Sequence, residues 1–118
     1  MHELSIADAI VRIATAHAGG RQIETIEVKV GYLRQVVPDA LEFAFVLVAE
    51  GTEAQGAQLL LEEVPAAGIC RRCGIESELP GFPLACEACG SLDVELVRGE
   101  ELLVDALTME GEVPSGRS

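Results

Sequence analysis

Two Cys-x-x-Cys pairs, with 12 residues between them, constrain the fold of this 118-residue chain more than any other feature. The pairs contain all the cysteines of the chain: Cys70, Cys73, Cys86 and Cys89. A spacing of two residues lets both thiolates of a pair turn toward one ion, and two pairs supply a tetrahedron of sulfurs. Gly74 and Gly90 directly follow the pairs, where a positive φ is commonly required. The spacing predicts a four-thiolate metal site that folds the surrounding segment.

The expected metal is Zn²⁺ in a structural role, because four thiolates leave no open position for a catalytic water. An iron site with four thiolates is compatible with the same spacing. A secreted disulfide pair would need an export signal, which the start of the chain lacks, and a thioredoxin-like redox site uses only one such pair. Arg71 and Arg72 either offset the charge of the sulfurs or form a basic spot for a partner.

The charge balance of the chain excludes some classes of binding partner but does not identify one. The chain has 8 basic and 20 acidic residues, a formal net charge of −12. Such a surface repels nucleic acid and anionic lipid, because both need a basic footprint. No apolar run approaches the roughly 20 residues that span a bilayer. We therefore expect a soluble, cytoplasmic protein that binds neither nucleic acid nor membrane.

The hydrophobic periodicity predicts two helices and several strands. One helix is expected from about Ile6 to Ala18 with Ser5 as its N-cap, and a second from Pro38-Asp39 to Gly51 with Asp39 as its cap. The second helix is apolar nearly all round, which predicts burial on more than one side. The expected strands cover residues 26–32, 57–64, 94–98 and 102–109.

This order of elements predicts an α+β fold. We expect a small mixed or antiparallel sheet with both helices on one face, and an inserted zinc-ribbon-like domain with two CxxC knuckles. Residues 1–66 and 94–109 are assigned to the α/β domain and 67–93 to the zinc-binding domain. Residues 110–118 are rich in Gly, Pro and Ser and are expected to form a flexible tail.

The first three residues form a candidate second metal site. The bulky His2 predicts that Met1 is retained, so that its α-amine, the His2 amide and the His2 imidazole lie within reach of one ion. Nitrogen donors in a plane suit Ni(II) or Cu(II), and the Glu3 amide or carboxylate could complete the set. The alternative is that an isolated N-terminal histidine is simply a polar end.

The remaining polar residues have ordinary structural interpretations. His17 lies in the last turn of the first helix, where a cationic side chain is favourable, and Asp39 is explained as a helix cap. We find no nucleophile–base pair and no phosphate-binding glycine loop, so we predict that the chain is not an enzyme.

Several stretches of this chain resemble the HypA/HybF family of hydrogenase nickel-incorporation proteins. They are Met1-His2-Glu3-Leu4-Ser5, Gly31-Tyr32-Leu33 through Val37-Pro38-Asp39-Ala40-Leu41-Glu42-Phe43-Ala44-Phe45, Gly56-Ala57 through Val64-Pro65, the paired CxxC segment, and Gly99-Glu100-Glu101-Leu102. The resemblance implies an α/β nickel-binding domain and a zinc domain. It also implies that Met1, His2 and Glu3 bind nickel and that the four cysteines bind zinc.

The resemblance further implies delivery of Ni(II) during maturation of [NiFe]-hydrogenase. The implied partners are a maturation GTPase, the hydrogenase large subunit and, in some bacteria, urease maturation proteins. The main alternative is a zinc-stabilised protein–protein interaction module that does not transfer nickel. A zinc-ribbon nucleic-acid binder is disfavoured by the charge, and a redox protein by the expected metal.

Overall fold

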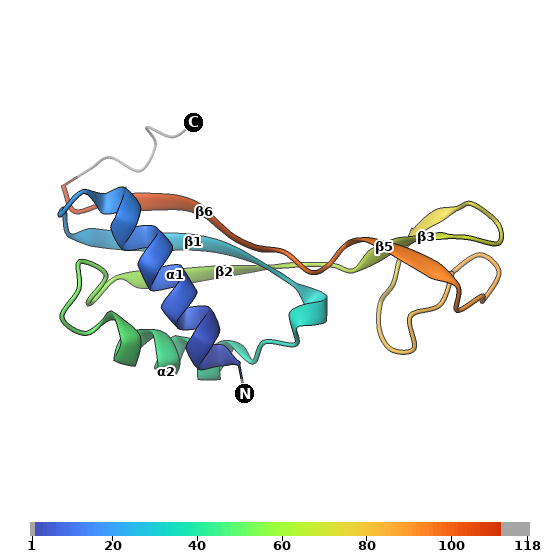
Figure 1. The fold of residues 1–118 in the computed structure, drawn as a ribbon, viewed down its shortest axis with the longest axis horizontal. Helices are drawn as coiled ribbons and strands as arrows, with labels where there is room; N and C mark the ends of the chain where they lie inside the picture. The colour runs from blue at the N-terminus through green and yellow to red at the C-terminus, as the bar shows by residue number, and fades with distance from the viewer. Residues whose placement is uncertain (1, 112–118) are drawn as a thin grey trace. The chain divides into compact units, whose positions relative to one another are not determined.

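The computed structural model describes residues 2–111 of the chain, so Met1 and most of the expected tail at 110–118 lie outside the described residues. Its elements follow each other in this order: α1 (Glu3–Ala18), β1 (Ile23–Gly31), the 3₁₀ helix η1 (Tyr32–Arg34), α2 (Pro38–Ala49), β2 (Gln58–Val64), β3 (Ala67–Cys70), β4 (Glu76–Glu78), β5 (Val94–Arg98) and β6 (Leu102–Met109). The chain separates into two units (Figure 1). We call residues 1–29, 36–62 and 103–118 the helical unit, and residues 30–35 and 63–102 the cysteine unit.

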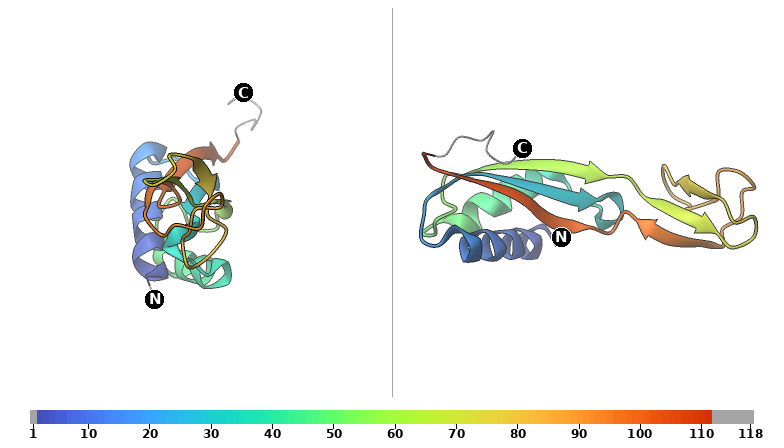
Figure 2. Two further views of the ribbon diagram at one scale, coloured as in Figure 1. Left: turned by 90° about the vertical axis from the view of Figure 1, so that its right-hand side faces the viewer. Right: turned by 90° about the horizontal axis from the view of Figure 1, so that it is seen from above.

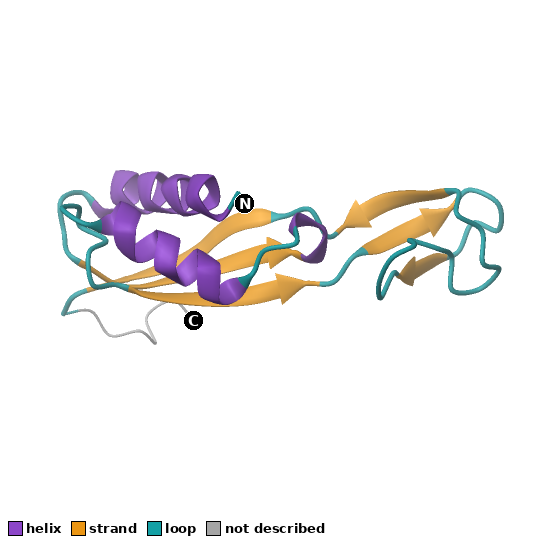
Figure 3. Cartoon of the chain, turned by 90° about the horizontal axis from the view of Figure 1, so that it is seen from below, coloured by secondary structure: helices purple, strands orange, loops and turns teal. Residues whose placement is uncertain are grey.

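A three-stranded sheet in the order β2–β1–β6 forms the base of the helical unit. β1 and β2 run in the same direction because α2 returns the chain between them, while β6 runs the opposite way (Figure 2). Ile26, Val28 and Val30 alternate along β1 and are buried, as a half-buried strand requires. Both helices lie on one face of the sheet (Figure 3). The expected α+β fold with a mixed sheet is confirmed.

Helix α1 begins earlier than the sequence predicted. Its first residue is Glu3, and His2 occupies the N-cap position without a side-chain capping bond. Ser5 is therefore inside the helix, where its hydroxyl donates to the His2 carbonyl at 3.0 Å. The predicted helix start at about Ile6, with Ser5 as the N-cap, was wrong, because Glu3 is already helical. A carboxylate in the first helical turn is favoured by the helix dipole, and Glu3 is also buried, with 7% of its surface exposed.

Helix α2 differs from the prediction at its start and on its outer side. Pro38 is its first residue, so Val37 takes the N-cap position, and Asp39 lies in the first turn without capping the helix. Leu41, Ala44 and Phe45 are buried as expected. The apolar residues of the opposite side are exposed, contrary to the expected burial on more than one side: Phe43, Val46 and Leu47. The sheet and α1 cover only one side of α2.

A second three-stranded sheet, in the order β4–β3–β5, organises the cysteine unit. β3 pairs antiparallel with β4, with Gly68 opposite Ser77, and antiparallel with β5, with Cys70 opposite Val94. The sequence predicted β5 and β6 with their observed bounds but missed β3 and β4, because strands of four and three residues are too short to show a period. β5 and β6 follow each other through Gly99–Glu101 yet belong to different sheets.

No helix within residues 2–111 is both long enough and apolar enough to cross a membrane.

Candidate metal centre

The two CxxC pairs form matching backbone turns. In the first turn the Gly74 amide donates to the Cys70 carbonyl at 2.8 Å, and in the second the Gly90 amide donates to the Cys86 carbonyl at 2.8 Å. Gly74 and Gly90 both have a φ of 79°, as the sequence predicted. A residue with a Cβ would be strained in this conformation. The glycines therefore allow each pair to fold its two thiols toward the same side.

The four sulfurs converge on one point. Cys70 Sγ lies 3.6 Å from Cys89 Sγ, and Cys73 Sγ lies 3.6 Å from Cys86 Sγ. All four sulfurs lie within 4.8 Å of one another. These distances are far longer than the roughly 2.05 Å of a disulfide bond. The thiols are free, and their spacing is that of ligands around one metal ion.

Each turn contributes one buried and one exposed cysteine. Cys70 and Cys86 are 1% and 3% exposed, whereas Cys73 and Cys89 are exposed. Cys70 ends β3, so its position is set by the strand pairing with β4 and β5. The centre is therefore anchored to the sheet on one side and open to solvent on the other.

Backbone amides lower the proton affinity of the buried thiols. The amides of Cys73 and Arg72 each lie 3.4 Å from Cys70 Sγ. These amides, with smaller contributions from the Cys89 and Cys73 thiols, lower the pKa of Cys70 to about 6 against the opposing effect of burial. Amide hydrogen bonds from Cys89 and Ala88 lower the pKa of Cys86 in the same way. Amide donors favour a thiolate because they stabilise its negative charge.

The exposed thiol of Cys73, by contrast, holds its proton more tightly than an ordinary cysteine. The Ile75 amide acts to lower the pKa of Cys73, but desolvation and the neighbouring sulfurs raise it to about 11. Four thiolates this close repel one another, and a divalent ion at their centre reverses the effect. The donor set is therefore built for a metal that favours sulfur.

Arg71, the residue that follows Cys70, fixes the first cysteine turn through an ion pair. Arg71 forms an ion pair with Asp93, with Nη1 and Oδ1 2.8 Å apart. The Asp93 carboxylate raises the pKa of Arg71, and the Arg71 amide also donates to the Asp93 carbonyl at 2.9 Å. Arg71 thus ties the first cysteine turn to the segment before β5. The sequence carried no signal for Asp93, because 22 residues separate the pair.

The structure places His2 and Glu3 at the start of α1, in the helical unit, whereas the four cysteines lie in the cysteine unit. The His2 carbonyl accepts the Ile6 amide at 3.0 Å, and the His2 side chain is exposed. The Glu3 carboxylate accepts the Val37 amide at 3.1 Å. This bond holds the N-termini of α1 and α2 together. Met1, the third residue of the predicted nickel site, lies outside the described residues.

The Val37 amide, which binds the Glu3 carboxylate, was not predicted from the sequence. It lies 34 residues from Glu3 in the chain, and a backbone amide has no signature in a sequence. His17 lies in the last turn of α1, as predicted. Within residues 2–111, the four cysteines form the one group of three or more His, Cys, Asp or Glu side chains with metal-binding spacing.

The fold and the site together define a small α+β metal-binding protein with a four-cysteine centre. A family model described as "Hydrogenase/urease nickel incorporation, metallochaperone, hypA" matches residues 1–109. Among curated relatives, the hydrogenase maturation factor HypA of Geotalea uraniireducens is 44% identical over 93% of this chain and 100% of its own. The factor of the same name from Geobacter metallireducens is 42% identical, and the match again covers 93% of this chain and 100% of the relative.

The solution structure of the Ni metallochaperone HypA from Helicobacter pylori has a TM-score of 0.70 with this chain. The two are 23% identical, and the match covers 95% of this chain and 100% of the other. The fold is therefore shared. The chain belongs to the HypA family of nickel-incorporation metallochaperones for hydrogenase maturation. The family description agrees with the expectation that the chain is not an enzyme.

Proposed function

We propose that this protein binds Ni(II) at its N-terminus through Met1, His2 and Glu3, and delivers the ion to [NiFe]-hydrogenase during maturation. The observation that carries the proposal is the exposed His2 side chain at the start of α1, next to a Glu3 held by the Val37 amide. The imidazole is presented to solvent from a backbone position that the helix fixes. An exposed site suits a carrier, because the ion has to leave again.

The proposed nickel ligands are the α-amine of Met1, the imidazole and amide of His2, and the amide or carboxylate of Glu3. The first residues of a helix contribute no amide to the i→i−4 ladder. Glu3 is the first residue of α1, so its amide lies outside the helical hydrogen-bond ladder; it donates to the Glu3 carboxylate itself, a bond that metal binding at the amide would replace. Nitrogen donors of this kind suit the planar geometry that Ni(II) favours.

We further propose that the resident metal of the four-cysteine centre is Zn²⁺, held by Cys70, Cys73, Cys86 and Cys89. A tetrahedral site with Zn–S bonds of roughly 2.3 Å has sulfurs roughly 3.8 Å apart. The 3.6 Å separations of the two sulfur pairs fit this arrangement. The zinc would supply folding energy to the cysteine unit and neutralise its thiolates. Ni(II) is then the cargo rather than the structural ion.

The proposed setting is the cytoplasm, with a maturation GTPase and the hydrogenase large subunit as partners. The family description names both hydrogenase and urease, so urease maturation proteins are a second possible destination. The acidic chain, with a net charge of −12, suits cation capture and basic partners.

A Ni(II) titration with an authentic, untagged N-terminus tests the proposal. The wild-type protein, loaded with zinc, is compared by calorimetry with His2→Ala and with His17→Ala. His17 is the only other histidine of the chain and is also exposed, so His17→Ala controls for removal of an exposed imidazole. We expect one Ni(II) per chain for the wild type and for His17→Ala. We expect a loss of at least 100-fold in affinity for His2→Ala, with zinc content unchanged.

Two other outcomes would change the conclusion. Equal affinity in all three proteins would place nickel away from the N-terminus. No nickel binding by any of them, with zinc retained, would leave the zinc-stabilised protein–protein interaction module as the function.

A further inference from the structure

The exposed side of the four-cysteine centre opens into a surface depression. Its volume is about 410 Å³, and it is lined by Arg72, Cys73, Cys89, Gly90 and Ser91. Cys73 and Cys89 are the exposed cysteines of the two turns. A small molecule that enters the depression from solvent therefore reaches one sulfur from each turn.

The charge of this depression comes from Arg72. Arg71 is held in its ion pair with Asp93, whereas within residues 2–111 the Arg72 guanidinium has no carboxylate partner. Arg72 is also exposed. A guanidinium without a partner is a strong donor for carboxylates, and it stands out locally on a chain with a net charge of −12. The depression therefore favours an anionic small molecule over a cationic one.

The two 3.6 Å sulfur contacts of the centre both cross from one turn to the other. They join the exposed Cys89 to the buried Cys70, and the exposed Cys73 to the buried Cys86. A disulfide bond is roughly 2.05 Å long, so each pair has to close by roughly 1.5 Å to form one. Each sulfur that a small molecule can reach therefore has a second, buried sulfur close behind it in the other turn.

We propose that the four-cysteine centre is an oxidation site for an anionic, low-molecular-weight disulfide, and that oxidation forms the cross-turn bonds Cys70–Cys89 and Cys73–Cys86. The Cys73 thiolate attacks one sulfur of the small disulfide, which breaks that disulfide, forms a mixed disulfide and releases one thiolate. The Cys86 thiolate then attacks the Cys73 sulfur and releases the second thiolate. A second molecule oxidises Cys89 and Cys70 in the same way, so two small disulfides are reduced for four cysteines oxidised.

This inference rests on the proposed resident Zn²⁺, because a metal-bound thiol is deprotonated and the thiolate is the nucleophile in this exchange. Oxidation of the ligands releases the ion. The cross-turn bonds connect the same two turns that the metal connects, so the oxidised unit should stay folded but bind no metal until it is reduced. His2 lies in the helical unit, so the oxidised chain should still bind Ni(II).

The rate of zinc release tests the role of the depression. Oxidised glutathione, an anionic disulfide, is added to the zinc-loaded chain, and the released ion is followed with a chromogenic chelator. Arg72→Gln removes the positive charge of the depression. Arg12→Gln is the matched control, because it removes the same charge from an exposed arginine of α1 that is paired with Asp8. We expect Arg72→Gln to slow release by about threefold or more and Arg12→Gln to leave it nearly unchanged, because steering by charge acts locally. Cystamine, a cationic disulfide, should release zinc from Arg72→Gln no more slowly than from the wild type.

Peptide mapping of the oxidised chain tests which sulfurs are joined. Trypsin and a Glu-specific protease together place the four cysteines in four separate peptides, because Arg71, Glu76 and Glu87 lie between successive cysteines. After alkylation of any free thiols, mass spectrometry identifies the linked peptides. We expect each buried cysteine to be linked to the exposed cysteine of the other turn.

Three results would overturn the oxidation proposal. They are disulfides within each CxxC pair, retention of zinc in excess oxidised glutathione, and equal rates of release from Arg72→Gln and Arg12→Gln. A wild-type chain that holds no zinc before oxidation would instead refute the proposed resident metal. The nickel titration is independent of all of these, because it measures the N-terminal site in the other unit.

Discussion

The backbones of Gly31 and Gly99 pass so close to each other in the cysteine unit that a Cβ at position 31 would not fit. Replacing Gly31 with alanine tests how much stability depends on this approach. A Cβ at position 31 would overlap the carbonyl oxygen of Gly99 and lie 2.5 Å from the Glu100 amide nitrogen. Both obstacles are backbone atoms, so no side-chain rotation relieves the overlap. The two segments have to separate.

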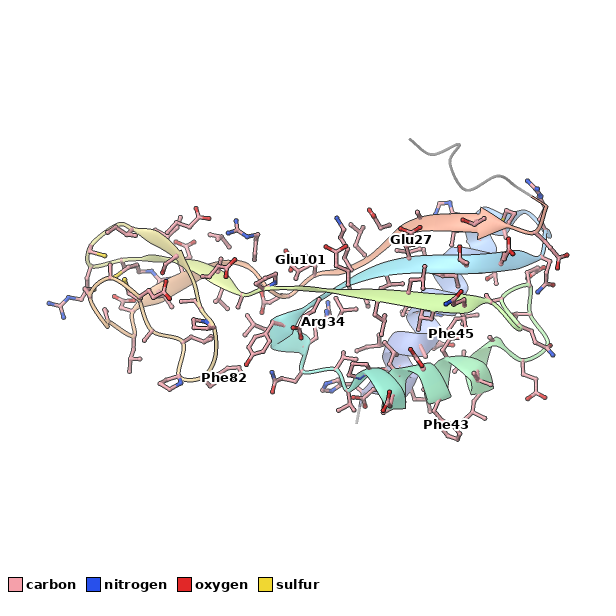
Figure 4. The ribbon with its side chains drawn as sticks, turned by 180° about the vertical axis from the view of Figure 1, so that it is seen from behind. Glu27, Arg34, Phe43, Phe45, Phe82 and Glu101 are labelled. Atoms are coloured by element: carbon pink, nitrogen blue, oxygen red, sulfur yellow. The ribbon has the colours of Figure 1, made fainter. Side chains whose placement is uncertain are left out.

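Separation would break the hydrogen bonds that join these segments. The Gly31 amide donates to the Glu101 carbonyl at 2.7 Å, and the Leu33 amide donates to the Gly99 carbonyl at 2.8 Å. Arg34 Nε also donates to the carbonyls of Glu100 and Glu101 at 2.9 and 3.1 Å; Figure 4 labels Arg34 and Glu101. Each backbone hydrogen bond contributes about 1 kcal/mol net, and more when a donor is left unpaired. We expect Gly31→Ala to lower the free energy of unfolding by about 2–4 kcal/mol.

Urea unfolding of the zinc-loaded protein, followed by circular dichroism, measures this change. Gly81→Ala is the matched control, because the Cβ at position 81 would meet nothing nearer than the Tyr32 hydroxyl at 3.9 Å. We expect the control to stay within about 0.5 kcal/mol of the wild type, as most substitutions away from such contacts do. A Gly31→Ala protein as stable as Gly81→Ala would refute the reasoning.

Two further predictions concern the cysteine unit. Cys73→Ser should remove the resident metal, because a serine hydroxyl does not ionise as a thiol does; Cys73 is exposed, so the loss would not come from core packing. Metal analysis after dialysis against a chelator should find about one zinc per wild-type chain and almost none in the variant, and full retention would contradict a four-thiolate site. Phe82→Ala should cost about 0.5–1.5 kcal/mol, since the Phe82 ring stacks on Tyr32 with centroids 6.0 Å apart. Leu92→Ala is its control, because Leu92 is 68% exposed and should change the unfolding midpoint little; equal effects would mean that the ring stack contributes nothing.

The local pattern of the sequence determined the parts of this protein that depend on near neighbours. The alternation at Ile26, Val28 and Val30 predicted the buried face of β1, and the bounds of β5 and β6 agree with the prediction. The CxxC spacing predicted a four-thiolate cluster, and the glycines after each pair predicted the positive φ values. Within each strand and within each CxxC turn, residues a few positions apart carry the physical cause, and only the meeting of the two cysteine pairs needs residues 13 to 19 positions apart. Periodicity and spacing are therefore sufficient.

The tertiary structure alone decided where α1 begins and which side of α2 is covered. Ser5 looked like a cap, but Glu3 is already helical, and its carboxylate accepts a hydrogen bond from Val37, 34 residues away. The outer face of α2 looked like core because its residues are apolar. It stays exposed because the one sheet of the helical unit and α1 cover only the side with Leu41, Ala44 and Phe45. Hydrophobicity says which side chains gain from burial, but only the placement of distant segments determines which of them are buried.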